Sequence, residues 1–71
     1  MEVLKNILKY RRTTSNLSQR EVAEKVKISQ VGYSKIESGE NIPSLKTCLK
    51  LAVVLGFNME DLKESVRKEL R

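Results

Sequence analysis

The chain has 71 residues, 39% of them hydrophobic and 32% charged, a balance that suits one folded domain spanning 1–71 and argues against a disordered chain. Its formal net charge is +5, and residues 1–36 hold the whole excess, with eight bases against three acids, whereas residues 37–71 carry six of each. Such asymmetry favours a polyanionic partner such as nucleic acid or an anionic membrane, although a solvated basic surface would give the same charge.

The sequence also argues against several classes of protein. No apolar run approaches the roughly 18–20 residues of a membrane span, and the first apolar run is too short for a signal peptide, so we expect a cytoplasmic protein without a membrane partner. The single cysteine, Cys48, cannot form an internal disulfide. With no histidine, no metal-ligand cluster and no phosphate-binding glycine loop, we expect neither an enzyme nor a cofactor, metal or small-molecule ligand.

Helical periodicity runs through the whole chain, and no strand pattern competes with it. The first helix is predicted over about residues 2–12, where apolar residues recur at helical spacing, and the polar run TTSN that follows favours a turn. The second helix begins at Ser18, which forms a capping-box pattern with Glu21 three residues later. Its inward face is predicted to consist of Val22, Ala23 and Val26.

The third helix is predicted to start at Ser29, another good cap residue, and to end before Gly39, which can take the left-handed conformation. Tyr33 and Ile36 lie three residues apart and are expected to face the core. The remaining face is rich in hydrogen-bonding side chains and free of acids, which is unusual for an ordinary surface helix. It consists of Gln30, Val31, Ser34 and Lys35.

Two further helices follow in the second half of the chain. Ser44 caps a fourth, strongly apolar helix that ends at Gly56 and is expected to lie at the centre of the core. Its apolar residues are Leu45, Cys48, Leu49, Leu51, Ala52 and Leu55. Asn58, with Asp61 three residues later, caps a fifth helix over about residues 59–70. The short connections between the helices are typical of a compact all-α unit.

The second and third helices are each about two turns long and are joined by only a few residues, which is the helix-turn-helix arrangement. The blocks LSQREVAEKV, ISQVGYSKIESG, PSLKTCLKLAVVLGF and MEDL resemble, in order and spacing, the phage-repressor and Cro type of helix-turn-helix, also called the xenobiotic-response-element type. The resemblance covers about residues 17–62. It implies a compact, five-helix, lambda-repressor-like DNA-binding domain of the all-α class, with the helix-turn-helix at helices 2 and 3.

The resemblance also implies roles for individual residues. Base-reading positions would be Gln30, Val31, Ser34 and Lys35, and phosphate-contacting positions would be Ser18, Gln19, Ser29 and Ser38. Gln19 would also brace Gln30, which can pair with adenine in the major groove. Glu37 would form an internal ion pair with either Arg11 or Arg12. The lysines outside these positions that are expected to be solvated charges are Lys5, Lys9, Lys46 and Lys50.

Three features depart from the pattern of that family. Lys27 stands where many members have glycine, and a left-handed backbone would cost a lysine about 1 kcal/mol there. Tyr33 occupies a position usually held by Ile or Val, so its hydroxyl must find a partner or reach the surface. The loop RTTSN is one residue longer than usual, which leaves the arginine partner of Glu37 open. Without the resemblance, Lys35 would be read as a solvated charge and Val31 as an exposed apolar residue.

The fifth helix carries an apolar stripe that either packs onto its own core or contributes to a dimer. We favour a dimer interface built from Val53, Phe57, Leu62, Val66 and Leu70. Because members of the family usually dimerise on palindromic operators, the predicted function is a sequence-specific regulator of transcription that binds double-stranded DNA. We expect a repressor that acts as a homodimer through a recognition helix in the major groove. The alternative is a protein-binding module, such as an antitoxin or adaptor, with the same fold.

Overall fold

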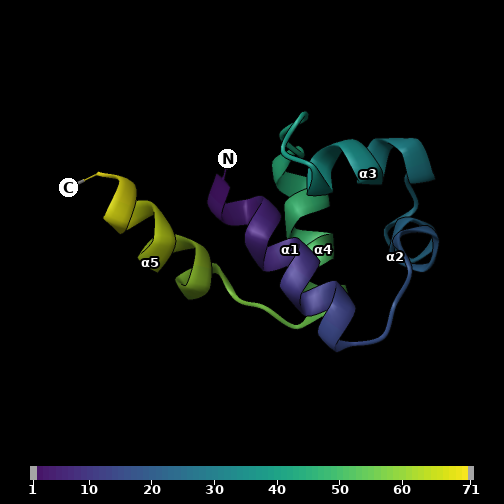
Figure 1. The fold of residues 1–71 in the computed structure, drawn as a ribbon, viewed down its shortest axis with the longest axis horizontal. Helices are drawn as coiled ribbons and strands as arrows, with labels where there is room; N and C mark the ends of the chain where they lie inside the picture. The colour runs from purple at the N-terminus through teal and green to yellow at the C-terminus, as the bar shows by residue number, and fades with distance from the viewer. Residues whose placement is uncertain (1, 71) are drawn as a thin grey trace.

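The computed structural model describes residues 2–70, and within them it contains five helices and no strand. The helices are α1 (Glu2–Thr14), α2 (Gln19–Val26), α3 (Gln30–Glu37), α4 (Leu45–Leu55) and α5 (Met59–Glu69). Figure 1 shows α3 across the top of the molecule beside α2, α1 and α4 in the middle, and α5 at the other end. The prediction of a compact, all-α, five-helix fold of the lambda-repressor type is therefore confirmed.

Four of these helices begin at the cap residues that the sequence predicts. In each, the cap side chain accepts a hydrogen bond from the backbone N–H three residues later; the caps are Ser18, Ser29, Ser44 and Asn58. At Ser18 and Asn58 the backbone N–H of the cap residue in turn donates to the carboxylate of that third residue, Glu21 or Asp61, which completes a capping box. Since a cap of this kind contributes about 1 kcal/mol, even helices as short as α2 and α3 start at fixed positions.

The core lies between α1, α2, α3 and α4. Its largest fully buried side chains are Tyr33, Leu8, Leu51, Val22 and Val26. Every residue that was predicted to face inward from the second and third helices is buried, which confirms the predicted orientation of both. The small side chain of Ala23 is also buried, in keeping with the close packing of α2 against α3.

Helix α1 extends two residues beyond its predicted end, because two threonines continue it. The hydroxyl of Thr13 donates to the carbonyl of Lys9 at 2.8 Å, and that of Thr14 donates to the carbonyl of Tyr10. These side-chain bonds stay within the helix, so the TTSN run does not end it at once. The chain turns only at Asn16, which has a φ of 58°. The loop that looked one residue too long is therefore partly helix.

Helix α4 is less completely buried than predicted. Leu51 and Leu55 lie in the core, and Cys48 and Ala52 are half-buried against it. Leu45, however, is 70% exposed and Leu49 is 47% exposed. The helix is apolar around more of its circumference than the core can cover, so two of its leucines face outward on different sides.

The five residues proposed for a dimer interface do not form one surface in the folded chain. Phe57 and Leu62 are only 4% and 7% exposed and complete the core of their own molecule. Val53 and Leu70 are more than 80% exposed, but Val53 lines a hollow beside α2, whereas Leu70, Val66 and the edge of Leu62 line a groove between α5 and the start of α4. The spacing of four identified the stripe correctly but did not show which of its members the core uses.

The turn between α2 and α3 forms around Lys27, which is left-handed with φ 61° and ψ 46°. The N–H of Lys27 donates to the carbonyl of Glu24, and the N–H of Ile28 donates to the carbonyl of Ala23. This pair of bonds is a Schellman motif, which glycine usually ends. A lysine side chain is thus held in a backbone conformation that glycine would adopt without strain.

Replacing Lys27 with glycine should therefore raise the free energy of unfolding by about 1 kcal/mol, because it removes the left-handed penalty of a side chain. Urea denaturation followed by circular dichroism measures the change. Lys25→Gly is the matched control: it lies inside the last turn of α2, where glycine should cost about 1 kcal/mol instead. If Lys27→Gly is less stable than the parent chain, the left-handed conformation of Lys27 does not cost stability as proposed.

Candidate nucleic-acid interface

The outer face of α3 brings together the residues that were predicted to read bases. A shallow hollow between α2 and α3 is lined by Gln19, Gln30, Val31, Ser34 and Lys35. Among these, Val31 is 67% exposed although it is apolar, and no acidic side chain lines the hollow. The opposite face of α3 buries Tyr33, Ile36 and Glu37. The helix is thus fixed from behind and presents an unpacked, acid-free surface in front. Figure 1 shows α3 itself along the upper edge of the molecule.

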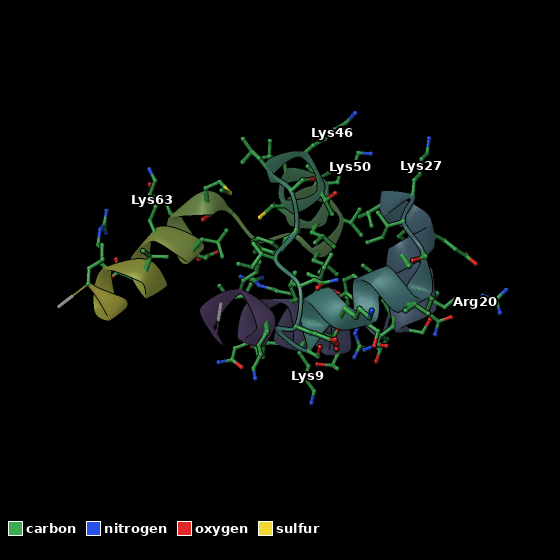
Figure 2. All side chains as sticks on the ribbon, turned by 90° about the horizontal axis from the view of Figure 1, so that it is seen from above. Lys9, Arg20, Lys27, Lys46, Lys50 and Lys63 are labelled. Atoms are coloured by element: carbon green, nitrogen blue, oxygen red, sulfur yellow. The ribbon has the colours of Figure 1, made fainter. Side chains whose placement is uncertain are left out.

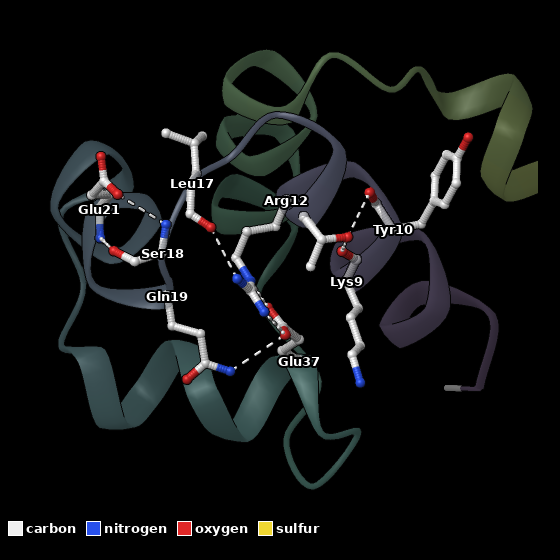
Figure 3. Close-up of polar contacts among 9 residues, drawn as sticks. Lys9, Tyr10, Arg12, Leu17, Ser18, Gln19, Glu21 and Glu37 are labelled. Atoms are coloured by element: carbon white, nitrogen blue, oxygen red, sulfur yellow. Dashed lines mark hydrogen bonds and ion pairs between the residues drawn. The ribbon is translucent and has the colours of Figure 1, made fainter.

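An ion pair between α1 and α3 holds this helix in place. Arg12 Nε donates to Glu37 Oε2 at 2.7 Å, and Arg12 Nη2 donates to Glu37 Oε1 at 2.8 Å, so the contact is bidentate. The third nitrogen, Nη1, donates to the carbonyl of Leu17 at 2.9 Å, immediately before α2 begins. One guanidinium therefore joins α1, the start of α2 and the end of α3, as Figure 3 shows. The structure also settles the choice of arginine, because Arg11 instead approaches Asp61 at 3.8 Å.

Gln19 takes part in the same network. Its Nε2 donates to Glu37 Oε1 at 3.3 Å rather than to Gln30, the partner that the resemblance implied. Gln19 and Gln30 still line one hollow, so the two side chains share a surface without the predicted bond. Sequence reasoning missed both the bond from Gln19 to Glu37 and the carbonyl contact at Leu17. The bond from Gln19 to Glu37 could have been suspected from the sequence, because Glu37 is a polar residue at the end of α3. The contact at Leu17 uses a backbone carbonyl, which no sequence pattern marks.

Comparisons with known proteins agree with this geometry. A family model described as helix-turn-helix matches residues 8–62, which adds the second half of α1 to the region identified by resemblance. The chain belongs to this helix-turn-helix family. That match includes the whole Arg12–Glu37 framework as well as the two helices that line the hollow.

Several curated proteins are similar to the chain over most of its length. An uncharacterized HTH-type transcriptional regulator of Methanocaldococcus jannaschii is 41% identical over 59 residues, covering 83% of this chain and 89% of that protein. A cryptic phage CTXphi transcriptional repressor of Vibrio cholerae is 32% identical over 83% of the chain, and the ImmF control region 10 kDa protein of Bacillus phage phi105 is 32% identical over 80% of it. The chain spans 53% and 63% of the length of these last two proteins. No solved structure matches significantly.

The charges of this helix-turn-helix framework stabilise one another. Burial alone would raise the pKa of the Glu37 carboxyl, but the interactions with the Arg12, Tyr33 and Gln19 side chains and the arginine charge lower that pKa below its ordinary value. The hydrogen bond to Glu37 raises the pKa of Arg12. Tyr33 lies beside this pair with its hydroxyl buried. That hydroxyl makes no hydrogen bond of good geometry among the described residues but is close enough to interact with the Glu37 carboxylate, and burial above all raises its pKa. Both partners of the ion pair therefore stay charged at neutral pH.

The serines that were predicted to contact phosphates differ in what they can still donate. Ser18 and Ser29 accept backbone N–H bonds as caps, which leaves the proton of each hydroxyl available to an outside acceptor. The hydroxyl of Ser38 already donates to the carbonyl of Lys35 at 3.0 Å. The geometry of the helix-turn-helix therefore favours Ser18 and Ser29 over Ser38 as donors to a phosphate.

Two further observations concern other kinds of site. Within residues 2–70, no three acidic, histidine or cysteine side chains gather where they could bind a metal ion. In the same part of the chain, none of the helices combines the length and hydropathy that spanning a membrane requires.

Proposed function

We propose that the chain is a sequence-specific regulator of transcription that binds double-stranded DNA with α3 in the major groove and acts as a repressor. The observation that carries this proposal is the outer face of α3, which is unpacked, free of acids and fixed by the Arg12–Glu37 pair behind it. Family membership and the repressor named among the relatives support the same function. The positive first half of the chain favours binding to a polyanion.

The four residues of that face suit the edges of base pairs. A major groove about 12 Å wide admits one helix, and Gln30 can form two hydrogen bonds with an adenine there. The exposed methyl groups of Val31 suit contact with a thymine methyl, and Lys35 can reach guanine or a phosphate. The free hydroxyl protons of Ser18 and Ser29 would fix the register on the backbone.

We further propose that the regulator binds a palindromic operator as a homodimer. A second copy would cover the apolar groove between α5 and the start of α4, where Ile42, Leu45 and Leu70 are each at least 70% exposed. The two cations that line this groove are already paired within α5, Lys63 with Glu60 and Arg67 with Glu64, so two copies would not repel there.

The position of this groove also suits a dimer on DNA. Residues of α5 line one side of it, and in Figure 1 α5 lies at the opposite end of the molecule from the N-terminus of α3. With a two-fold axis on that side and a molecule 36 Å long, two copies of α3 could lie roughly 34 Å apart, which is one turn of DNA.

Selection of bound duplexes from a random DNA pool tests this function, and we expect a palindromic site. On that site Gln30→Ala should cost about 1–3 kcal/mol of binding and relax the preference at one base pair of each half. The control is Asn6→Ala, which truncates an exposed polar side chain on α1, outside the residues that line the hollow. If Gln30→Ala keeps both affinity and preference, α3 does not read bases through Gln30.

The apolar groove also supports a second candidate, a protein-binding module of the antitoxin or adaptor kind. A partner helix could occupy the same groove in place of a second copy. Binding to duplex DNA at moderate salt distinguishes the two functions, because a module that only binds protein would show none.

A further inference from the structure

A second basic surface lies at the C-terminal end of α2, opposite the end that carries Gln19. We call it the lysine hollow; it is lined by Lys25, Lys27, Lys46, Leu49, Lys50, Val53 and Val54. It shares no lining residue with the hollow on the outer face of α3. Figure 2 shows Lys27, Lys46 and Lys50 projecting along one edge of the molecule, whereas Lys9 projects from the opposite edge.

The lysine hollow gathers four lysines, of which Lys25 also interacts electrostatically with Glu21, one turn earlier on α2. None of its four lysines forms an ion pair within residues 2–70, and no acidic side chain lines it. By contrast, Arg20, Lys63 and Arg67 each pair with a glutamate on their own helix. Two of the lysines, Lys46 and Lys50, were expected from the sequence to be solvated charges, and the fold places them beside two more.

The floor of the hollow is apolar. Val53 is 84% exposed at a position where a polar side chain would cost nothing, and Leu49 beside it is 47% exposed. A phosphate backbone would satisfy the lysines but would leave these two side chains without an apolar contact. A segment that carries carboxylates on one side and apolar side chains on the other would satisfy both. The combination therefore favours an acidic protein segment over nucleic acid.

A second observation points to the same place. Lys27 contributes its charge to the hollow from a left-handed backbone conformation that glycine would adopt more easily. Backbone strain of this kind tends to persist where the side chain has a use. A second copy of the chain is disfavoured as the occupant, since a two-fold contact through Val53 would bring lysines against lysines.

We propose that the lysine hollow binds an acidic, amphipathic segment of a partner protein, with its carboxylates on the four lysines and its apolar side chains on Leu49 and Val53. The proposal does not rest on the function of α3. Because the two surfaces share no residue, the partner and DNA can bind at the same time, and the partner would meet the chain beside its DNA-facing helix.

The test uses a synthetic helical peptide with leucines on one face and glutamates on the other, titrated into the intact ¹⁵N-labelled chain. We expect amide shifts centred on the residues of the lysine hollow. Lys50→Glu and, separately, Val53→Asp should each weaken binding by roughly tenfold. Lys9→Glu changes the net charge by the same amount on the opposite edge and should have little effect. A peptide with glutamine in place of glutamate should not bind.

Three results would overturn the proposal. The first is an absence of shifts in the hollow, and the second is an equal loss of peptide binding in Lys9→Glu, which would mean attraction by net charge alone. The third is that a random-sequence duplex shifts the hollow residues and competes with the peptide, which would assign the surface to DNA. The sequence preference selected by Lys50→Glu from a DNA pool should equal that of the parent chain. A chain that binds the peptide but no duplex would refute the proposed function and leave this inference standing.

Discussion

Replacing Glu37 with alanine should lower the free energy of unfolding by about 3–5 kcal/mol, which is among the largest effects of any single change in this chain. Glu37 is 7% exposed and is the only carboxylate that faces the partly buried guanidinium of Arg12 in the described hydrogen bonds. Its loss leaves Arg12 charged, partly desolvated and without a counter-ion. Because a 71-residue domain is typically stable by only roughly 4–10 kcal/mol, the variant should be close to unfolding at 25 °C.

Urea denaturation measures this change, and an exposed ion pair provides the control. Glu64→Ala removes the partner of Arg67. The side chains of Glu64 and Arg67 are both more than half exposed, so this change should lower the free energy of unfolding by less than about 1 kcal/mol. A double variant that replaces Arg12 and Glu37 with methionine and leucine should recover much of the loss, since it removes both charges together. Equal losses from Glu37→Ala and Glu64→Ala would show that burial does not strengthen the framework pair.

The same pair gives stability a defined pH dependence. The folded pKa of Glu37 lies below its ordinary value of 4.5, so the unfolded chain takes up the proton first as the pH falls. The contribution of Glu37 to stability is therefore complete above about pH 4.5 to 5 and is lost as the pH falls through the folded pKa. A Glu37→Gln variant should show a flatter decline of stability in that acid range than the parent chain does.

Replacing Leu45 with glutamate should lower the affinity for a full palindromic operator by about 10²–10⁴-fold, because each monomer then binds its half-site alone. Leu45 is 70% exposed and lines the apolar groove proposed to hold a second copy. A carboxylate placed there would be buried without a partner in the dimer. Sedimentation equilibrium should show a shift from dimer to monomer, and the affinity for a single half-site should change little.

Leu49→Glu is the matched control for that experiment. It introduces the same side chain on the same helix, one turn further along, but Leu49 lines the lysine hollow instead of the groove. It should leave the oligomeric state unchanged. Dimers that persist in Leu45→Glu but dissociate in Leu49→Glu would place the interface on the other side of α4.

Local sequence signals predicted the helices well because each start has its own chemistry. Ser18 with Glu21 and Asn58 with Asp61 fix helix ends within four residues, without help from the rest of the fold. Lys27 and Tyr33 were also singled out from the sequence as departures from the family pattern, and the structure places Lys27 in a left-handed turn and Tyr33 in the core. Each depends on local spacing and is therefore visible before any packing is known.

The errors concern questions that only packing decides. Apolar spacing placed Leu62, Val66 and Leu70 on one stripe, but the core covers Leu62 and leaves Leu70 exposed. Leu45 and Leu49 both belong to an apolar helix, yet the neighbours of α4 cover neither. The choice between Arg11 and Arg12 likewise depended on which face of α1 packs against α3, because Arg12 meets Glu37 whereas Arg11 points toward Asp61 on α5. Such outcomes depend on contacts between distant segments, which a single sequence does not show.

The division of α3 into a buried face and an outward face has a consequence for redesign. Its inward residues, together with Arg12, hold the helix in position, whereas Gln30, Val31 and Lys35 lie mostly in solvent. The outward residues can therefore be exchanged for those of another member of the family at little cost in stability. The chain would serve as a scaffold of 71 residues onto which a new base preference is grafted by changing a single helix face.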